Sequence, residues 1–155
     1  MNTNSEAAAS GQPQPYRDRK RNAWVLSLLV PLFVAAGPLL WFWVPHPAML
    51  WIPVLFVYGV APAIDWLIGV DTSNPPESAV PALEAERYYR HVTFGLVPLL
   101  WAAFVGAAWF SQRADLSWMG LAGLVIATGA VGGFCINLGH ELGHKRTPLE
   151  RWLTK

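Results

Sequence analysis

Residues 117–138 read Ser-Trp-Met-Gly-Leu-Ala-Gly-Leu-Val-Ile-Ala-Thr-Gly-Ala-Val-Gly-Gly-Phe-Cys-Ile-Asn-Leu, and no side chain in this run is charged. A helix needs about 20 apolar residues to cross the ~30 Å hydrocarbon core of a bilayer. Helices buried in soluble proteins are seldom apolar over such a length. The run therefore predicts a helix that spans a membrane.

Three further apolar runs of similar length precede this one, at about 24–44, 48–70 and 92–110. Hydrophobic residues make up 54% of the 155-residue chain and charged residues only 14%, about half the charged share of a typical globular domain. The nine tryptophans suit a boundary between lipid and water. We expect an all-α fold, an integral membrane helical bundle with four transmembrane helices.

Prolines interrupt the first three predicted spans. Proline lacks the N–H that continues a helix, but membrane helices tolerate it because neighbouring groups satisfy the freed carbonyls. Kinks are therefore expected at these positions, which are Pro31, Pro38, Pro53, Pro62 and Pro98.

The distribution of positive charge predicts the orientation. Ten of the eleven Lys and Arg residues fall on one side of the membrane if the N-terminus is cytoplasmic, and basic residues favour that side. Residues 1–23 are expected to form a disordered cytoplasmic tail, ahead of a membrane domain over residues 24–155. We expect a multi-pass protein of a bacterial inner (plasma) membrane, surrounded by membrane lipids. A net charge of +1 predicts no nucleic-acid partner.

The fourth predicted span ends in a motif with metal-binding chemistry, His-Glu-Leu-Gly-His at residues 140–144. On a helix, side chains four residues apart share one face, so His140 and His144 can chelate one metal ion. The same pattern is the helix signature of zinc metalloproteases, in which Glu141 would be the general base. The motif alone leaves both readings open.

The histidines continue a stripe of small residues along the same helix. Gly129 and Gly133 form a G-x-x-x-G pair, which lets a second helix approach closely. Asn137 follows on the same stripe and is suited to hold a ligand by hydrogen bonding. We therefore expect the histidine face to point into the bundle.

Three segments give the chain a resemblance to the membrane alkane 1-monooxygenases. The first is residues 64–77 (I-D-W-L-I-G-V-D-T-S-N-P-P-E), and the second is residues 86–90 (E-R-Y-Y-R). The third is residues 137–145 (N-L-G-H-E-L-G-H-K), which matches the first histidine box of that family. The N-P-P-E and R-Y-Y-R segments are not expected in an intramembrane zinc protease.

The resemblance implies a fatty-acid-desaturase-like membrane domain of about six helices, with two non-haem iron ions at its cytoplasmic end. It implies hydroxylation of medium- to long-chain n-alkanes to 1-alkanols with O2, and electrons from rubredoxin and rubredoxin reductase. His140 and His144 match the iron ligands of the first box, while Glu141 and Lys145 match its other charged positions in a supporting role.

A second group of candidate residues lies on the second predicted span. Asp65, near its cytoplasmic end, is expected to support the metal site or its cavity. Helical spacing places Val57 and Ala61 on the face of Asp65, where small side chains would leave room for an alkyl chain. We expect these two residues to line a substrate channel.

Two histidines are too few for a di-iron site, so the 155-residue chain is expected to be inactive by itself, as a fragment that lacks the later histidine boxes. His46 lies in an outer turn and His91 is expected at the membrane interface. Two alternatives to the hydroxylase remain: an intramembrane zinc metalloprotease and a membrane hairpin domain without catalysis.

Overall fold

The computed structural model describes residues 16–69, 75–145 and 147–154, and every regular element in these ranges is a helix. This confirms the predicted all-α fold. Three of the helices are long and apolar enough to cross a membrane, and a bent pair brings the number to as many as four. Residues 1–15 of the predicted tail lie outside the described ranges.

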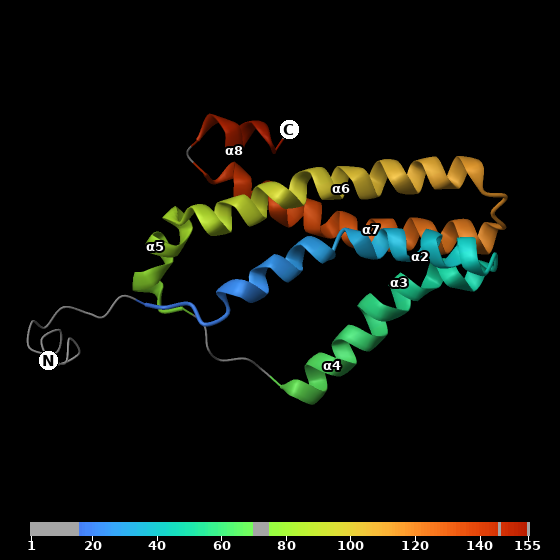
Figure 1. Ribbon diagram of the computed structural model, residues 1–155, viewed down its shortest axis with the longest axis horizontal. Coiled ribbons are helices and arrows are strands. Elements are labelled where there is room, and N and C mark those ends of the chain that lie inside the picture. The colour runs from blue at the N-terminus through green and yellow to red at the C-terminus, as the bar shows by residue number, and fades with distance from the viewer. Residues whose placement is uncertain (1–15, 70–74, 146, 155) are drawn as a thin grey trace, which may run out of the picture.

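Figure 1 shows two long antiparallel helices, with the first part of the chain packed along them. The elements are η1 (Arg21–Leu29), α2 (Leu32–Trp43), η2 (Pro47–Trp51), α3 (Ile52–Leu55), η3 (Phe56–Val60), α4 (Ala61–Ile68), η4 (Glu77–Ala79), α5 (Val80–Ala85), α6 (Arg87–Arg113), α7 (Trp118–Gly143) and α8 (Pro148–Trp152).

The first predicted span consists of two helices that meet at an angle of 46°. η1 is a 3-10 helix, and α2 begins directly after Pro31. Proline cannot donate to the preceding turn, and its ring collides with the carbonyl four residues earlier. The kink expected at Pro31 is confirmed, whereas Pro38 is accommodated inside α2.

The second span runs from Pro47 to Ile68 and changes its winding on the way. It opens in the 3-10 turn η2, where the backbone N–H of Ala48 donates to Nδ1 of His46 at 3.2 Å. η3 is a π-helical turn that ends just before Pro62. A wider turn relieves the contact between a proline ring and the preceding carbonyls, which explains its position.

The packed part of the protein is formed by α2, η2, α6 and α7, which contact one another closely. Its buried side chains are Val34, Leu50, Leu100, Ala107, Phe110, Leu124 and Val131. Leu50 fits against Gly37 of α2 and Gly120 of α7, where added Cβ atoms would meet it closely.

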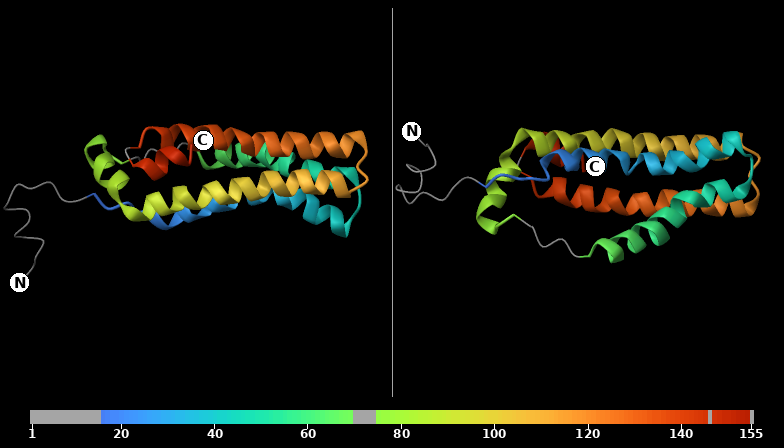
Figure 2. Two further views of the ribbon diagram at one scale, coloured as in Figure 1. Left: turned by 90° about the horizontal axis from the view of Figure 1, so that it is seen from above. Right: turned by 60° about the horizontal axis from the view of Figure 1, so that its bottom comes forward.

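By contrast, α4 leans away from the bundle (Figure 2). Every residue from Pro62 to Gly69 is exposed, and the substantial packing of α4 in the described chain is with η3 alone. The second span thus touches α7 near one end and diverges from it toward the other.

Glycine is required at position 123, where a Cβ atom would lie 2.8 Å from the indole of Trp51. That indole is held in place because its Nε1–H donates to the carbonyl of Met119 at 3.0 Å. Gly123→Ala is therefore expected to lower stability by about 1–3 kcal/mol, as overpacking does. Thermal unfolding in detergent would measure it, with Gly106→Ala as the control, since Gly106 faces open space. Equal melting temperatures for the two variants would contradict this packing.

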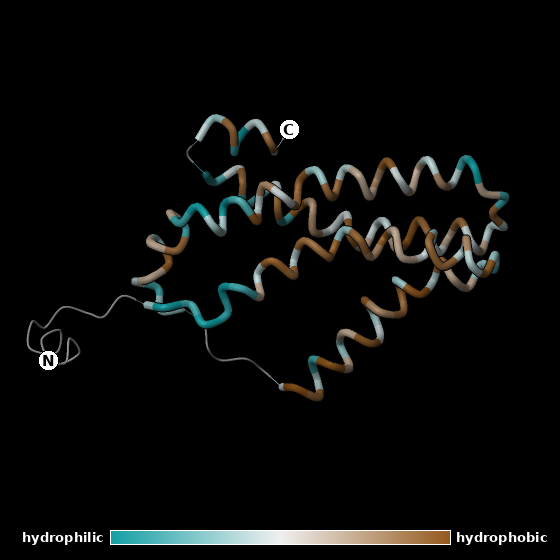
Figure 3. Tube along the Cα trace, in the orientation of Figure 1, coloured by the Kyte–Doolittle hydropathy of each residue, from teal (hydrophilic) through white to brown (hydrophobic). Residues whose placement is uncertain are grey.

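Polar residues gather at one end of the long helices, as Figure 3 shows. This end holds the segment before η1, the beginning of α6, the end of α7 and α8 (Figure 1). The opposite end holds the connections α2–η2 and α6–α7. Arg87, Arg90 and Lys145 therefore share an end with the histidine motif, in the arrangement that the sequence predicted.

Candidate metal centre

The end of α7 places His140, in its last turn, beside His144, the residue that caps the helix at the polar end. Their Nε2 atoms lie 3.1 Å apart, and their ring centroids are separated by 4.5 Å. Two nitrogens that bind one metal at about 2.1 Å lie about 3.0 Å apart at a right angle and about 3.4 Å apart at a tetrahedral angle. In the structure this contact is a hydrogen bond between the two imidazoles, whose donor depends on the tautomer. The same separation is that of adjacent ligands on one metal ion.

Both histidines are exposed, and Asn137 is exposed one turn before them. Within residues 16–69, 75–145 and 147–154, no third His, Cys, Asp or Glu joins the pair to form a cluster of metal ligands. Asn137 and Glu141 together line a pocket of about 240 Å³ beside Ser27 and Thr93. The described residues thus bring together two imidazole nitrogens and a polar neighbour.

The stripe that leads to the histidines does not pack as expected. Cβ atoms added at Gly129 or Gly133 would meet nothing within 4 Å in the described chain. The glycines that allow close approach are Gly120 and Gly123, on a different face of α7. The prediction that the histidine face points toward the other helices was therefore wrong for this part of the chain. Spacing shows which residues share a face, but not which face is covered.

Glu141 and Lys145 form an ion pair with each other beside the two histidines, and neither of them joins the histidine pair. Nζ of Lys145 lies 2.6 Å from Glu141 and 3.3 Å from Glu84, which precedes α6. Partial burial would lower the pKa of Lys145, but hydrogen bonds to the two carboxylates outweigh it and raise that pKa. Lys145 therefore stays charged and ties the end of α7 to α5.

A second set of contacts fixes the chain just after the histidines. Thr147 and Glu150 form a capping box that starts α8, with Thr147 Oγ1 donating to Glu150 at 2.6 Å. Nε of Arg90, on α6, donates to the other carboxylate oxygen at 2.9 Å. The Thr147 hydrogen bonds and then Arg90 hold the pKa of Glu150 below its usual value, against the opposing effect of burial.

Sequence reasoning missed this arrangement of Arg90, Thr147 and Glu150. The T-x-x-E pattern of a capping box was present as a signal at residues 147–150. The partner on α6, however, is 60 residues away in sequence, and no local pattern reveals it. Glu150 is 3% exposed, and among the described residues it is the one charged side chain that is buried.

The remaining predicted site residues lie apart from the histidines. Asp65 is exposed on α4, while Val57 and Ala61 are half-buried where η3 meets α4. Because α4 packs substantially on η3 alone, the described chain does not bring these three residues to the end of α7. They lie on the part of the second span that diverges from α7.

These observations define the class of the protein, which is a multi-helix membrane protein with a pair of histidines at its polar end. Three curated relatives, each an alkane 1-monooxygenase, extend the comparison. That of Ectopseudomonas oleovorans is 38% identical over 90% of this chain, and one from Alcanivorax borkumensis is 40% identical over 90%. That of Pseudomonas putida is 36% identical over 98%.

Over the stretch that it spans, the chain is therefore similar to the alkane 1-monooxygenases. It covers 35%, 35% and 38% of the lengths of these three relatives. No family model matches the chain.

Proposed function

We propose that this chain is part of a membrane alkane 1-monooxygenase that converts medium- to long-chain n-alkanes to 1-alkanols with O2 at a di-iron site. The observation that carries the proposal is the Nε2–Nε2 separation of 3.1 Å between His140 and His144, in a chain whose relatives are named for this activity. The long apolar helices support it further, because n-alkanes partition into the bilayer.

In this proposal His140 and His144 hold one of two irons through their Nε2 atoms, since imidazole is a good ligand for iron. When bound, the irons supply the redox chemistry that activates O2. Asn137 holds a ligand or bridging group from one turn below. The Glu84–Lys145–Glu141 contacts keep the last turn of α7 helical, so that the two imidazoles stay on one face.

The polar end faces the cytoplasm of a bacterium in this proposal, and the membrane is the inner one. Basic residues favour the cytoplasmic side, and they gather at the end that carries the histidines. Rubredoxin, reduced by rubredoxin reductase, would deliver electrons here. Arg151, exposed at this end, contributes positive charge that would speed encounter with an acidic electron carrier.

The alkyl chain is proposed to lie along the second span, past Val57 and Ala61. Val57→Trp is expected to lower the longest alkane accepted by the complete enzyme by several carbons, because the indole fills the space beside η3. Product profiles over a series of alkane lengths would measure this. Leu55→Trp is the control, since Leu55 is 63% exposed and lies on another face of the same helix. An unchanged upper length for Val57→Trp would remove these residues from the substrate path.

The test of the proposed function is the metal content and product of the complete protein after purification from membranes. We expect two irons per chain, and 1-alkanol formation from n-alkane that depends on O2 and reduced rubredoxin. The 155-residue chain alone should form none. One zinc per chain and peptide hydrolysis would instead support the protease alternative, in which Glu141 would have to leave Lys145 to act as a base. Absence of any metal would support a non-catalytic membrane domain.

A further inference from the structure

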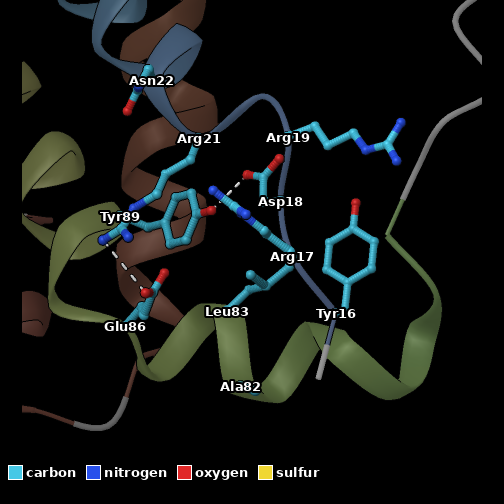
Figure 4. A pocket seen from close by; sticks show the side chains of 10 residues that line it. All are labelled: Tyr16, Arg17, Asp18, Arg19, Arg21, Asn22, Ala82, Leu83, Glu86 and Tyr89. Carbon is cyan, nitrogen blue, oxygen red and sulfur yellow. Dashed lines mark hydrogen bonds and ion pairs between the residues drawn. The ribbon is translucent and has the colours of Figure 1, made fainter. Parts of the chain in front are cut away.

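A second site lies at the polar end, between the chain segment before η1 and helix α5. It is an open pocket of about 1250 Å³ (Figure 4). One wall is formed by the segment before η1 and the first residues of η1, namely Tyr16, Arg17, Asp18, Arg19, Arg21 and Asn22. The other is formed by α5 and the start of α6, namely Ala82, Leu83, Glu86 and Tyr89. Three arginines against two carboxylates leave the lining with a net charge of +1.

The segment before η1 is held in place by a hydrogen-bonded carboxylate. Asp18 accepts from the hydroxyl of Tyr89 at 2.5 Å, from the indole N–H of Trp24 at 3.2 Å and from the backbone N–H of Lys20 at 2.7 Å. The Tyr89 hydrogen bond is the main reason that the pKa of Asp18 is lowered. Its carboxylate is therefore occupied by donors that shape the wall.

Arg21 is fixed in a similar way. Its guanidinium lies 3.4 Å from Glu86 and 4.5 Å from the ring centre of Tyr88, whose hydroxyl donates to the Arg21 carbonyl at 2.6 Å. Glu86 therefore has a positive partner already. Both carboxylates of the pocket are engaged by the protein itself.

Arg17 and Arg19 are the two cations of the pocket that take no part in these contacts. No ion pair or hydrogen bond joins either guanidinium to another of the described residues. Figure 4 shows Arg17 lying across the pocket beside Asp18 and Tyr89, while Arg19 points away from them, outward from the rim. Guanidinium groups bind phosphate oxygens in pairs and are suited to this anion.

The place of the pocket beside the first apolar span indicates the source of such a phosphate. Trp24 lies a few residues away at the start of the first apolar span and is 54% exposed, as expected of a tryptophan at the membrane boundary. Basic pockets at this level face the lipid headgroups. Ala82 and Leu83 add an apolar wall that suits the glycerol region of a lipid.

We infer that this pocket binds the headgroup of an anionic phospholipid, with Arg17 contacting its phosphate and Arg19 adding positive charge at the rim. The ligand chemistry, a phosphate ester, is shared with free phosphate in the cytoplasm. The position at the membrane boundary and the apolar wall favour the lipid. The inference does not depend on the metal centre or on alkane hydroxylation.

The test is binding of phosphatidylglycerol to the complete protein, measured by native mass spectrometry after delipidation. Phosphatidylcholine is the lipid control and inorganic phosphate is the second arm. Arg17→Gln with Arg19→Gln is expected to weaken retention of phosphatidylglycerol about tenfold, because the charge-assisted contact of Arg17 and the nearby positive charge of Arg19 are lost. Arg151→Gln, an exposed position at the same end, should leave retention unchanged. Replacing both arginines with lysine keeps the charge and should lose only part of the binding.

Three outcomes would overturn the inference. The first is equal retention of phosphatidylglycerol by the double glutamine variant and the parent protein. The second is parent protein that retains phosphatidylcholine as well as phosphatidylglycerol. The third is inorganic phosphate binding as tightly as the lipid, which would assign the pocket to a soluble anion. Because Arg17 and Arg19 are exposed, both double variants are expected to fold, and circular dichroism would verify it.

Discussion

Replacing His140 with asparagine in the complete protein is expected to reduce alkane hydroxylation by more than about 100-fold, with loss of at least one bound iron. Residues that merely support a metal ligand change activity or affinity by about 10- to 100-fold, so loss of a ligand exceeds that range. The physical reason is the chelate: with His140 gone, His144 is left as a single nitrogen. Iron content per chain and 1-alkanol formation are the two measurements.

His91→Asn is the matched control for this experiment. His91 is exposed near the start of α6, at the same end of the protein as the pair. It should keep both the iron and the activity of the parent enzyme. Full iron occupancy in the His140→Asn variant would show that the pair is not a metal ligand set, even if activity fell.

Exchanging Glu150 for glutamine is expected to lower the stability of the protein by about 2 kcal/mol near neutral pH. Hydrogen bonds to charged groups contribute about 1.5–3 kcal/mol each, and the amide can replace only part of those made to Arg90 and Thr147. Thermal unfolding of the purified protein in detergent would measure the change. We also expect weaker iron retention, since α8 follows the histidines by only a few residues.

The same variant makes a prediction about pH. The pKa of Glu150 is lower in the folded protein than its ordinary value of 4.5, so protonation of this group favours unfolding. Its contribution to stability is therefore complete above about pH 4.5 and is lost as the pH falls through the folded pKa. The difference in melting temperature between parent and Glu150→Gln should shrink below pH 4.5.

The control for both measurements is Glu77→Gln, at an exposed position on η4. This variant should match the parent protein at every pH. A Glu150→Gln protein with the parent's melting temperature at neutral pH would mean that the contacts with Arg90 and Thr147 add nothing to stability. A constant difference down to pH 3 would contradict the lowered pKa.

The spans and the histidine pair were predictable because they depend on local sequence. Apolar length determines whether a helix can cross a bilayer, and a spacing of four places His140 and His144 together on any helix. The break at Pro31 follows from the chemistry of one residue. These features need no knowledge of which helices are neighbours.

The arrangement of the helices was not predictable in the same way. In a membrane, a face that meets lipid and a face that meets another helix are both apolar, so hydropathy could not show that α4 stands apart. For the same reason the sequence pointed to Gly129 and Gly133 as the packing seam of α7, whereas in the described chain the tight positions are Gly120 and Gly123. The Arg90–Glu150 pair joins residues far apart in sequence, which spacing cannot detect.

The π-helical turn at η3 determines how the second spans of homologous chains should be aligned. Such a turn amounts to one residue inserted into an α-helix, and one residue corresponds to about 100° of rotation. Deleting a single residue between Phe56 and Val60 would therefore turn every side chain of α4 by about that angle, with almost no change in span length. Homologous chains that differ by one residue here should be aligned with a gap inside the helix, because otherwise Ala61 and Asp65 would be matched to residues on the wrong face.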